Sequence, residues 1–350
     1  MTVSIIIAVK TWQKNLEECV GKCLELDFPD FEILILPDSD ADFPIEMKGH
    51  SPTNQGLSPV NDLRDRGLSL GFGNTNIKII PTGAVTPPVK RDIGIKHAQG
   101  EILAIIDDDT YPNPDWLKKA IRNFSDPDIA AVGGPAITPL EDGPMQKASG
   151  LVYSCPLVSG KFIYRYTPKK RQFVDDYPSS NFLIRKSMMQ ELGGFQTKFW
   201  PGEDTILCLK IIKNLKKKIV YDPEVIVYHH RRELFGPHLK QIASYALHRG
   251  YFVKHFPETS RKVIYYYLPS VLVVYLIAAA ATPFLSKTMQ GLYLAGLFFY
   301  LLLVLIFSLI TGRRMFVPVS IGIVLSHFTY GIYFLKGIFS SSLKEEIINK

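Results

Sequence analysis

The chain has 350 residues, of which 47% are hydrophobic and 21% charged, and a formal net charge of +7. That balance excludes an intrinsically disordered or fibrous protein, and only 4 cysteines in this length exclude a disulfide scaffold. No C-x-x-C spacing occurs, which disfavours a zinc ribbon and indicates a reducing compartment. Mean hydropathy is +0.09, which is high for a chain with 40 Lys and Arg residues, so we expect two segments of different character.

Short apolar runs alternate with helical patterns over the first 260 residues. The runs are continuous in their hydrophobicity, which is typical of strands buried on both faces of a sheet. Their alternation with helices predicts an α/β fold with a mostly parallel, doubly wound sheet. Residues 38–75 are rich in Pro, Gly, Asn and Asp and indicate a long, partly irregular insertion. The expected strands are residues 4–9, 31–36, 77–80, 101–106 and 129–134, and the expected helices are residues 13–26, 89–98 and 114–124.

Three consecutive carboxylates, Asp107, Asp108 and Asp109, follow the fourth of these strands. A buried strand would place them at its carboxyl end, where open α/β sheets bind ligands. Adjacent carboxylates repel one another, and a shared hard cation such as Mg²⁺ or Mn²⁺, held together with a diphosphate, would offset that repulsion. Acids also favour helix starts, but the next helix is expected to begin later, with Asn113 as its N-cap and Pro114 in its first turn. We therefore interpret the triplet as a metal and diphosphate site.

The chain resembles family 2 inverting glycosyltransferases of the GT-A fold in the segment AQGEILAIIDDDTYPNPDWL, and the resemblance covers about residues 2–235. It implies a donor site for a nucleotide-sugar at Asp107–Asp109, with the first and third acids at the ribose, diphosphate and metal. It also implies Mn²⁺ or Mg²⁺ as the cofactor. The upstream stretch KRDIGIKHAQGE resembles the family pattern A-R-N-x-G-x-x-x-A-x-G-E, so Arg91 is expected to reach the donor, while Asp92 replaces the usual Asn.

Two departures from the family pattern concern the nucleoside. The first strand is followed by KTW where family members often have P-x-Y-N, and the second is followed by Pro37, Asp38 and Ser39 in place of D-D-G-S. Asp38 can still meet a base or ribose, but the acid that usually accompanies it is missing. The choice among UDP, GDP and dTDP is therefore open.

A second stretch, SSNFLIRKSMMQELGGFQTKFWPGED, resembles the acceptor half of the family's site. It implies that Ser180 and Asn181 bind the acceptor and that Glu203 and Asp204 open a helix beside it. Two acids at a helix N-terminus are favoured by the helix dipole whatever their function. Inverting transfer also needs a carboxylate to accept the proton of the acceptor hydroxyl, and we assign this general base to Asp204, with Glu203 second.

The segment VIVYHHRREL follows the last predicted strand, where family members often carry a His. His229 or His230 matches that position and would complete a metal shell as a neutral imidazole. Arg231 or Arg232 would then bind the leaving diphosphate. The same basic segment is equally suited to facing anionic lipid, and both interpretations stay open.

The chain beyond residue 262 is predicted to form membrane-spanning segments. Three apolar runs, residues 264–285, 291–311 and 315–339, each meet the length of about 20 residues that crosses a bilayer. Residues 236–262 combine apolar positions at helical spacing with basic residues, which is typical of a helix in the membrane interface. Basic residues before the first run and between the second and third predict a cytoplasmic N-terminal domain. The predicted parts of the chain are a cytoplasmic glycosyltransferase domain of the GT-A fold (1–235), an interfacial helix or linker (236–262), a transmembrane region of about three helices (263–340) and a tail (341–350).

These features predict a multi-pass enzyme of the plasma or inner membrane that transfers one sugar from a nucleotide-sugar to a lipid-linked or cell-surface glycan, as in cell-envelope glycan synthesis. A polyprenyl-phosphate sugar synthase is an alternative, and a catalytically inactive sensor or scaffold that binds nucleotide-sugar is an alternative of another class. A processive synthase is disfavoured because Q-x-x-R-W is absent. Membrane lipids are expected partners, and nucleic acid is not, since no nucleic-acid module accompanies the basic charge.

Overall fold

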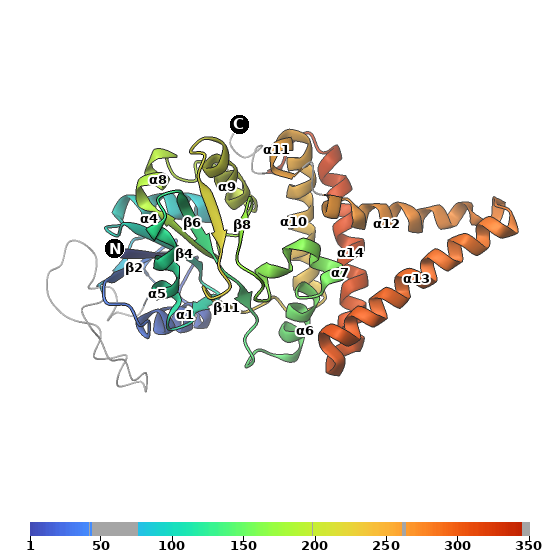
Figure 1. The fold of residues 1–350 in the computed structure, drawn as a ribbon, viewed down its shortest axis with the longest axis horizontal. Helices are drawn as coiled ribbons and strands as arrows, with labels where there is room; N and C mark the ends of the chain where they lie inside the picture. Colours follow the sequence, from blue (N-terminus) through green and yellow to red (C-terminus); the bar gives the residue numbers. More distant parts are fainter. Residues whose placement is uncertain (42, 44–75, 198, 261–263, 345–350) are drawn as a thin grey trace. The chain divides into compact units, whose positions relative to one another are not determined.

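The computed structural model describes residues 1–41, 43, 76–197, 199–260 and 264–344 (Figure 1). The insertion predicted over residues 38–75 lies mainly outside these residues. The chain forms two compact units: unit 1 comprises Met1–Ile137 and Pro168–His229, and unit 2 comprises Thr138–Thr167 and His230–Lys350. This division differs from the predicted boundary at residue 235, because residues 138–167 group with the C-terminal helices.

An eight-stranded mixed sheet forms the centre of unit 1, in the order β3-β2-β1-β4-β9-β6-β10-β8. Its strands are β1 (Val3–Ala8), β2 (Phe31–Leu36), β3 (Asn76–Ile79), β4 (Ile102–Asp107), β6 (Ile129–Gly133), β8 (Gln172–Val174), β9 (Asn181–Arg185) and β10 (Lys218–Tyr221). Strands β3, β2, β1 and β4 are parallel neighbours, whereas β9 is antiparallel to both β4 and β6. The five predicted strands are confirmed. The parallel half brings the carboxyl ends of β1, β2 and β4 to one edge, which is where such sheets bind ligands.

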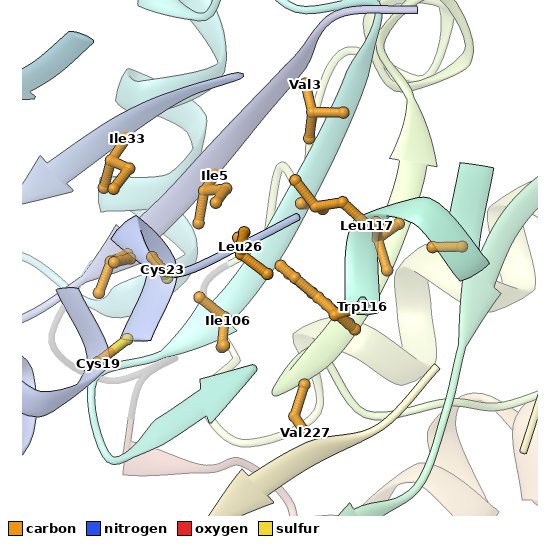
Figure 2. Close-up of a cluster of buried hydrophobic side chains, with 14 of the residues drawn as sticks. Val3, Ile5, Cys19, Cys23, Leu26, Ile33, Ile106, Trp116, Leu117 and Val227 are labelled. Atoms are coloured by element: carbon orange, nitrogen blue, oxygen red, sulfur yellow. The ribbon is translucent and has the colours of Figure 1, made fainter. Parts of the chain in front are cut away.

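The helices of unit 1 pack their apolar sides against this sheet. Ile5, Ile33 and Ile106 from neighbouring strands belong to one cluster of buried apolar side chains with Trp116 of α5, and all four side chains are fully buried (Figure 2). Burying a large apolar side chain stabilises a fold by about 1.5–3 kcal/mol, so this cluster holds the strand ends in place. The helices are α1 (Lys14–Leu24), α4 (Pro87–His97), α5 (Trp116–Ile121) with the 3-10 turn η1 (Arg122–Ser125), α8 (Lys186–Glu191) and α9 (Glu203–Lys213).

The predicted helices are found, with ends that differ from the predicted ones by up to three residues, and the start of α5 has a clear local cause. The helix begins at Trp116, later than predicted, because Asn113 closes a turn ahead of it. The Asn113 side chain accepts a hydrogen bond from the Asp115 backbone N–H at 3.3 Å, and its carbonyl accepts one from Trp116 N–H at 2.9 Å. Asn113 thus acts as a turn residue before the helix, and the triplet at residues 107–109 lies outside any helix start.

A small second sheet, β5-β11-β7, adjoins the carboxyl end of β4 in unit 1. Strand β11 (Val227–His229) is antiparallel to β5 (Thr110–Pro112) and parallel to β7 (Ala136–Ile137). The register places His229 opposite Thr110, the residue directly after the acidic triplet. This pairing brings a residue from the end of unit 1 next to Asp109.

Unit 2 is helical, and α10 (Gly236–His255) runs beside α14 (Phe316–Phe339) (Figure 1). The two backbones touch: a Cβ added at Gly250 would lie 2.1 Å from the Phe334 carbonyl oxygen, and one at Gly337 would lie 2.1 Å from that of Leu247. Close crossings of this kind require small residues. The glycines of the third apolar run therefore serve packing and do not break the helix. The packing also covers the Ala246 side of α10, and an interfacial position of α10 stays a prediction.

Two helical stretches of unit 2 are apolar and long enough to cross a membrane, judged by length and composition alone. One is Ile264–Phe284, formed by η3 (Ile264–Tyr266), α12 (Leu268–Ile277) and η4 (Ala278–Phe284). The other, Lys287–Phe339, contains α13 (Lys287–Gly312), the turn η5 (Arg313–Met315) and α14. Large apolar side chains are exposed along α12 and α13, including Val271, Phe298 and Phe299. The remaining described helices of the unit are α6 (Pro144–Tyr153), α7 (Pro156–Ser159), η2 (Gly160–Arg165) and α11 (Pro257–Ser260).

Candidate active site

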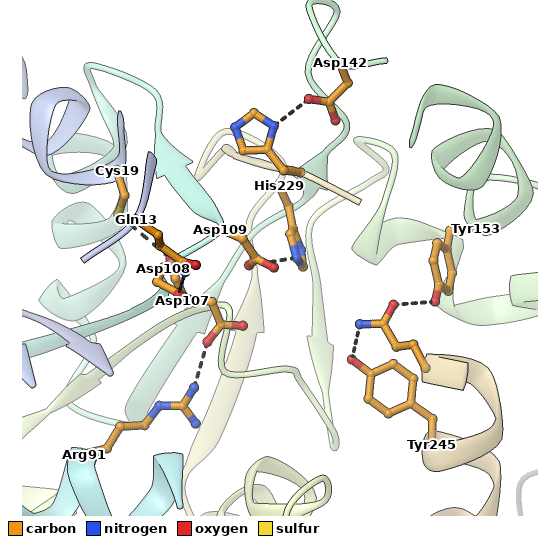
Figure 3. Close-up of polar contacts among 12 residues, drawn as sticks. Gln13, Cys19, Arg91, Asp107, Asp108, Asp109, Asp142, Tyr153, His229 and Tyr245 are labelled. Carbon is orange, nitrogen blue, oxygen red and sulfur yellow. Dashed lines mark hydrogen bonds and ion pairs between the residues drawn. The ribbon is translucent and has the colours of Figure 1, made fainter. Parts of the chain in front are cut away.

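The acidic triplet lies at the predicted edge of the sheet. Asp107 is the last residue of β4 and pairs in register with Ala8, the last residue of β1. Asp108 and Asp109 form the turn that leads into β5. The three carboxylates point in different directions and have different partners (Figure 3).

Arg91 on α4 joins the triplet to the acidic pair of α9. Its guanidinium is buried, with 3% of the residue exposed. It donates to Asp107 Oδ1 at 2.7 Å and to Glu203 Oε1 at 2.9 Å, and it lies 5.7 Å from the centre of the Phe195 ring. Arginine stays charged in proteins, so it compensates two carboxylates at once. Arg91, which is predicted to bind the donor, thus connects the acidic triplet after β4 with the acidic pair at the start of α9.

Asp108 turns toward α1. Gln13 donates its side-chain amide to Asp108 Oδ2 (Figure 3). Burial raises the pKa of Asp108 to about 7, and the neighbouring charges of Asp109 and Asp107 add to the effect. Like charges that crowd in this way are relieved by a cation, which is consistent with the metal predicted for the triplet.

Asp109 meets His229 across the β5–β11 pair. Its Oδ1 lies 3.2 Å from His229 Nε2, and both side chains are mostly but not fully buried. A carboxylate oxygen suits Mn²⁺ or Mg²⁺, and an imidazole nitrogen binds divalent transition metals, so these two residues fit a divalent cation. Within the described part of the chain, no group of three or more His, Cys, Asp or Glu side chains is arranged to hold a metal. A cation held by Asp109 and His229 would take its remaining ligands from a bound diphosphate and water.

His230, Arg231 and Arg232 belong to unit 2. His230 Nδ1 lies 2.5 Å from Oδ1 of Asp142 in the same unit, so of the two predicted histidines it is His229 that joins the triplet. Arg231 is buried, with its guanidinium 5.5 Å from the Tyr153 ring centre and 5.1 Å from that of Tyr166. Arg232 is exposed.

Glu203 and Asp204 open α9, as predicted, but their environments differ. Glu203 is buried against Arg91, and burial, with the Asp204 charge second, raises its pKa to about 7 although Arg91 acts in the opposite direction. Asp204 is half-buried, and its Oδ1 accepts from the Thr205 backbone N–H at 2.7 Å. Of the two acids, Asp204 is therefore the more accessible to another molecule.

Asn181, which is predicted to bind the acceptor, has its side chain held by hydrogen bonds within unit 1. It is buried, and its Oδ1 accepts from Trp116 Nε1 at 2.9 Å. Its amide N–H groups donate to the carbonyls of Gly134 at 2.6 Å and Val225 at 2.8 Å. These bonds account for most of what an Asn side chain can form, so the residue ties β9 to α5 and to the loops beside β6 and β11. Ser180, next to it, is also buried.

Asp92, which replaces the usual Asn of the family pattern, also has a structural role. Its two carboxylate oxygens accept from the backbone N–H groups of Phe195 at 2.7 Å and Gln196 at 3.1 Å. Gly194 has φ +93°, and a Cβ there would lie 2.4 Å from Asp92 Oδ1. Both backbone N–H groups need an acceptor. The carboxylate of Asp offers two acceptor oxygens, whereas the amide of Asn would offer only one. Asp92 thereby fixes the Gly-Gly-Phe turn that precedes Glu203 and Asp204.

Comparisons with known proteins identify the family and the fold. A model of glycosyl transferase family group 2 matches residues 102–330. The chain belongs to this family. It is a glycosyltransferase with a nucleotide-sugar donor, and the predicted family and GT-A fold are confirmed.

Individual relatives are distant. A dolichyl N-acetyl-α-D-glucosaminyl phosphate 3-β-D-2,3-diacetamido-2,3-dideoxy-β-D-glucuronosyltransferase of Methanococcus voltae is 24% identical over 259 residues, covering 72% of this chain and 74% of that one. A pre-mycofactocin glycosyltransferase of Mycobacterium tuberculosis is 30% identical over 152 residues, which span 42% of this chain but 31% of the relative. Among solved structures, mannosyltransferase PcManGT from Pyrobaculum calidifontis, in complex with GDP-Man and Mn²⁺, is 16% identical with a TM-score of 0.59, covering 97% of this chain and 88% of that one.

Proposed function

We propose that this glycosyltransferase is membrane-anchored and inverting, and that it transfers a single sugar from its nucleotide-sugar donor to a lipid-linked or cell-surface glycan. The observation that carries the proposal is the Arg91 bridge, which joins Asp107 of the triplet to Glu203 of the acidic pair within unit 1. Donor-binding and acceptor-activating carboxylates are thereby held at one sheet edge.

The donor half consists of the triplet and His229. Asp109 and His229 are the residues that would hold Mn²⁺ or Mg²⁺, and Asp107 and Asp108 complete the acidic surface that faces the donor. The bound cation would supply positive charge to the departing diphosphate. Mn²⁺ accompanies GDP-Man in the Pyrobaculum calidifontis mannosyltransferase, which supports the choice of ion. Within unit 2, His230 is paired with Asp142, Arg231 is buried and Arg232 is exposed, and the diphosphate-binding role of Arg231 or Arg232 stays a prediction.

The acceptor half depends on Asp204. This carboxylate accepts the proton of an acceptor hydroxyl while the hydroxyl oxygen bonds to the anomeric carbon. In the same step the bond from that carbon to the diphosphate breaks on the opposite face, and the nucleoside diphosphate leaves with the electron pair. Configuration is inverted because the displacement occurs once. Glu203 stays paired with Arg91 and positions the helix start.

The acceptor class follows from the relatives and from unit 2. The Methanococcus voltae enzyme acts, by its name, on a sugar carried by dolichyl phosphate, which supports a lipid-linked sugar over a bare lipid phosphate. The candidate spans Ile264–Phe284 and Lys287–Phe339 support anchoring in the plasma or inner membrane. We place the catalytic domain in the cytoplasm and α10 at the membrane interface, near such acceptors.

The test is a product assay with the purified full chain in lipid nanodiscs. Labelled UDP-, GDP- and dTDP-sugars are offered with either a polyprenyl phosphate or a polyprenyl-phosphate-linked monosaccharide. We expect one donor to label only the monosaccharide-bearing lipid. Labelling of the bare phosphate would identify a polyprenyl-phosphate sugar synthase. Binding of a donor without transfer or hydrolysis would identify the inactive sensor.

A further inference from the structure

Lys90, the residue before Arg91, is a buried lysine at the carboxyl ends of β1 and β2. Only 3% of it is exposed. Its Nζ donates to the Val9 carbonyl at 2.7 Å, to the Leu36 carbonyl at 3.3 Å and to Asp38 Oδ1. An ammonium group has three N–H donors, and these three acceptors use all of them. The family pattern has Ala at this position, so the lysine is a feature of this chain.

Asp38 is held in place through its backbone as well as through Lys90. Its backbone N–H donates to the Lys10 carbonyl at 3.0 Å, and its own carbonyl accepts from Gly83 N–H at 3.0 Å. Its side chain is bound through Oδ1 to Lys90 and is 24% exposed. Backbone and side chain are thus both anchored, and the carboxylate keeps one orientation with part of its surface accessible.

We propose that Lys90 is a positioning residue for the nucleoside of the donor, acting through Asp38. The inference rests on the proposed function, because it takes the edge at β1, β2 and β4 as the donor site. A carboxylate only accepts hydrogen bonds, so the donor group that meets Asp38 is a base N–H or a ribose hydroxyl. Lys90 also neutralises Asp38, so that this carboxylate adds no repulsion toward a diphosphate-bearing ligand.

Stability alone does not account for a lysine at this position. Replacing a buried ion pair by apolar residues is often neutral or stabilising, so the pair with Asp38 is not needed for stability, although the two backbone carbonyls would lose a donor. The sheet offers an internal comparison in Lys78, which binds Glu32 Oε2 at 2.8 Å. Glu32 also accepts from Ser4 near the start of β1, at the end of the strands opposite to Leu36. Both lysines therefore pair with an acid at an end of β2. Lys78 binds Glu32 at the end away from the donor edge, and Lys90 binds Asp38 at the donor edge.

The experiment compares Lys90→Met with Lys78→Met in the full chain. Binding of UDP, GDP and dTDP with Mn²⁺ is measured by titration calorimetry, and KM is measured for donor and acceptor separately. We expect Lys90→Met to weaken the best nucleotide by about ten- to hundredfold and to raise the donor KM, while the acceptor KM stays unchanged. Lys78→Met should keep wild-type nucleotide affinity even if it unfolds more easily.

The single variant Lys90→Met leaves Asp38 as an unpaired charge, which could unfold the protein. The double variant Lys90→Met with Asp38→Asn removes this charge and so separates loss of folding from loss of binding. We expect it to recover stability relative to Lys90→Met but not nucleotide affinity, since the anchored carboxylate is gone. Wild-type affinity in either Lys90 variant, or an equal loss in Lys78→Met, overturns the inference while the proposed function stands. If the wild-type chain binds no nucleotide, both are overturned.

Discussion

Replacement of Arg91 by Met is the most informative single change to the site. The variant removes the guanidinium that binds Asp107 at 2.7 Å and Glu203 at 2.9 Å. The Glu203 side chain is 6% exposed and that of Asp107 is 32% exposed, so nearly all of the loss falls on Glu203. Removing one partner of a buried ion pair destabilises a fold by about 3–5 kcal/mol, whereas an exposed pair contributes about 0–1 kcal/mol.

The loss should depend on pH, because Glu203 can become neutral. Burial and the charge of Asp204 already raise its pKa to about 7 with Arg91 present, and removal of Arg91 raises it further. The unfolded pKa is near 4.5, so the folded variant binds more protons than the unfolded chain between that value and the raised one. The stability of the variant therefore falls as pH rises through this window, and its deficit against wild type is larger at pH 8 than at pH 6.

The assay is thermal unfolding of the full chain at both pH values, where about 3–5 kcal/mol corresponds to roughly 6–20 °C. Lys118→Met, which breaks an exposed 3.0 Å pair with Asp27, is the control and should shift the midpoint little. The double variant Arg91→Met with Glu203→Gln should recover part of the loss and remove its pH dependence. A deficit in Arg91→Met no larger than in Lys118→Met would refute the bridging role.

Three further predictions concern chemistry, the helical unit and topology. Asp204→Asn should lower acceptor-dependent turnover by ~10²–10⁴-fold with donor affinity unchanged; near-normal transfer here with a dead Glu203→Gln would exchange the two roles. His238 is bound by Ser149 at 2.8 Å and Ser326 at 2.9 Å, and burial, with Arg231 second, lowers its pKa to about 4. The contribution of neutral His238 to the free energy of unfolding is therefore complete above pH 6.5 and should fall by about 3 kcal/mol as the pH drops toward 4. Thermal unfolding of His238→Gln should not show this loss of stability. A reporter fused after Lys350 should be exported if all three apolar runs cross the membrane, and a cytoplasmic reporter would show that residues 315–339 do not cross.

The sequence was sufficient for features that depend on local pattern. Continuous apolar runs located β1, β2, β3, β4 and β6, and the acids directly after β4 indicated the ligand edge. It was insufficient for features that depend on contacts between distant segments. The antiparallel insertion of β9 between β4 and β6 is of this kind, because a five-residue strand with three apolar residues carries no information on direction or neighbours.

The side-chain partners show the same limit. Motif position alone assigned Asn181 to the acceptor, but the backbone carbonyls that occupy its amide come from residues 134 and 225. Asp92 stood out only as a departure from the family pattern, and Lys90 was not singled out at all. Their partners Val9, Leu36 and Phe195 could not be read from their neighbours in sequence. His229 and His230 were equivalent in sequence, and only the β5–β11 register separated them.

Donor binding in the presence of Mn²⁺ tests the central proposal most directly. The melting temperature of the purified chain is measured with UDP-, GDP- and dTDP-sugars, with Mn²⁺ or with EDTA, for wild type and for Asp109→Asn. A ligand that binds only the folded state at a hundred times its Kd stabilises it by about 2.7 kcal/mol. We expect one nucleotide-sugar to raise the wild-type melting temperature with Mn²⁺, and neither EDTA-treated wild type nor Asp109→Asn to respond. An equal rise in EDTA or in Asp109→Asn, or no rise with any nucleotide-sugar, would contradict a metal-dependent donor site at the end of β4.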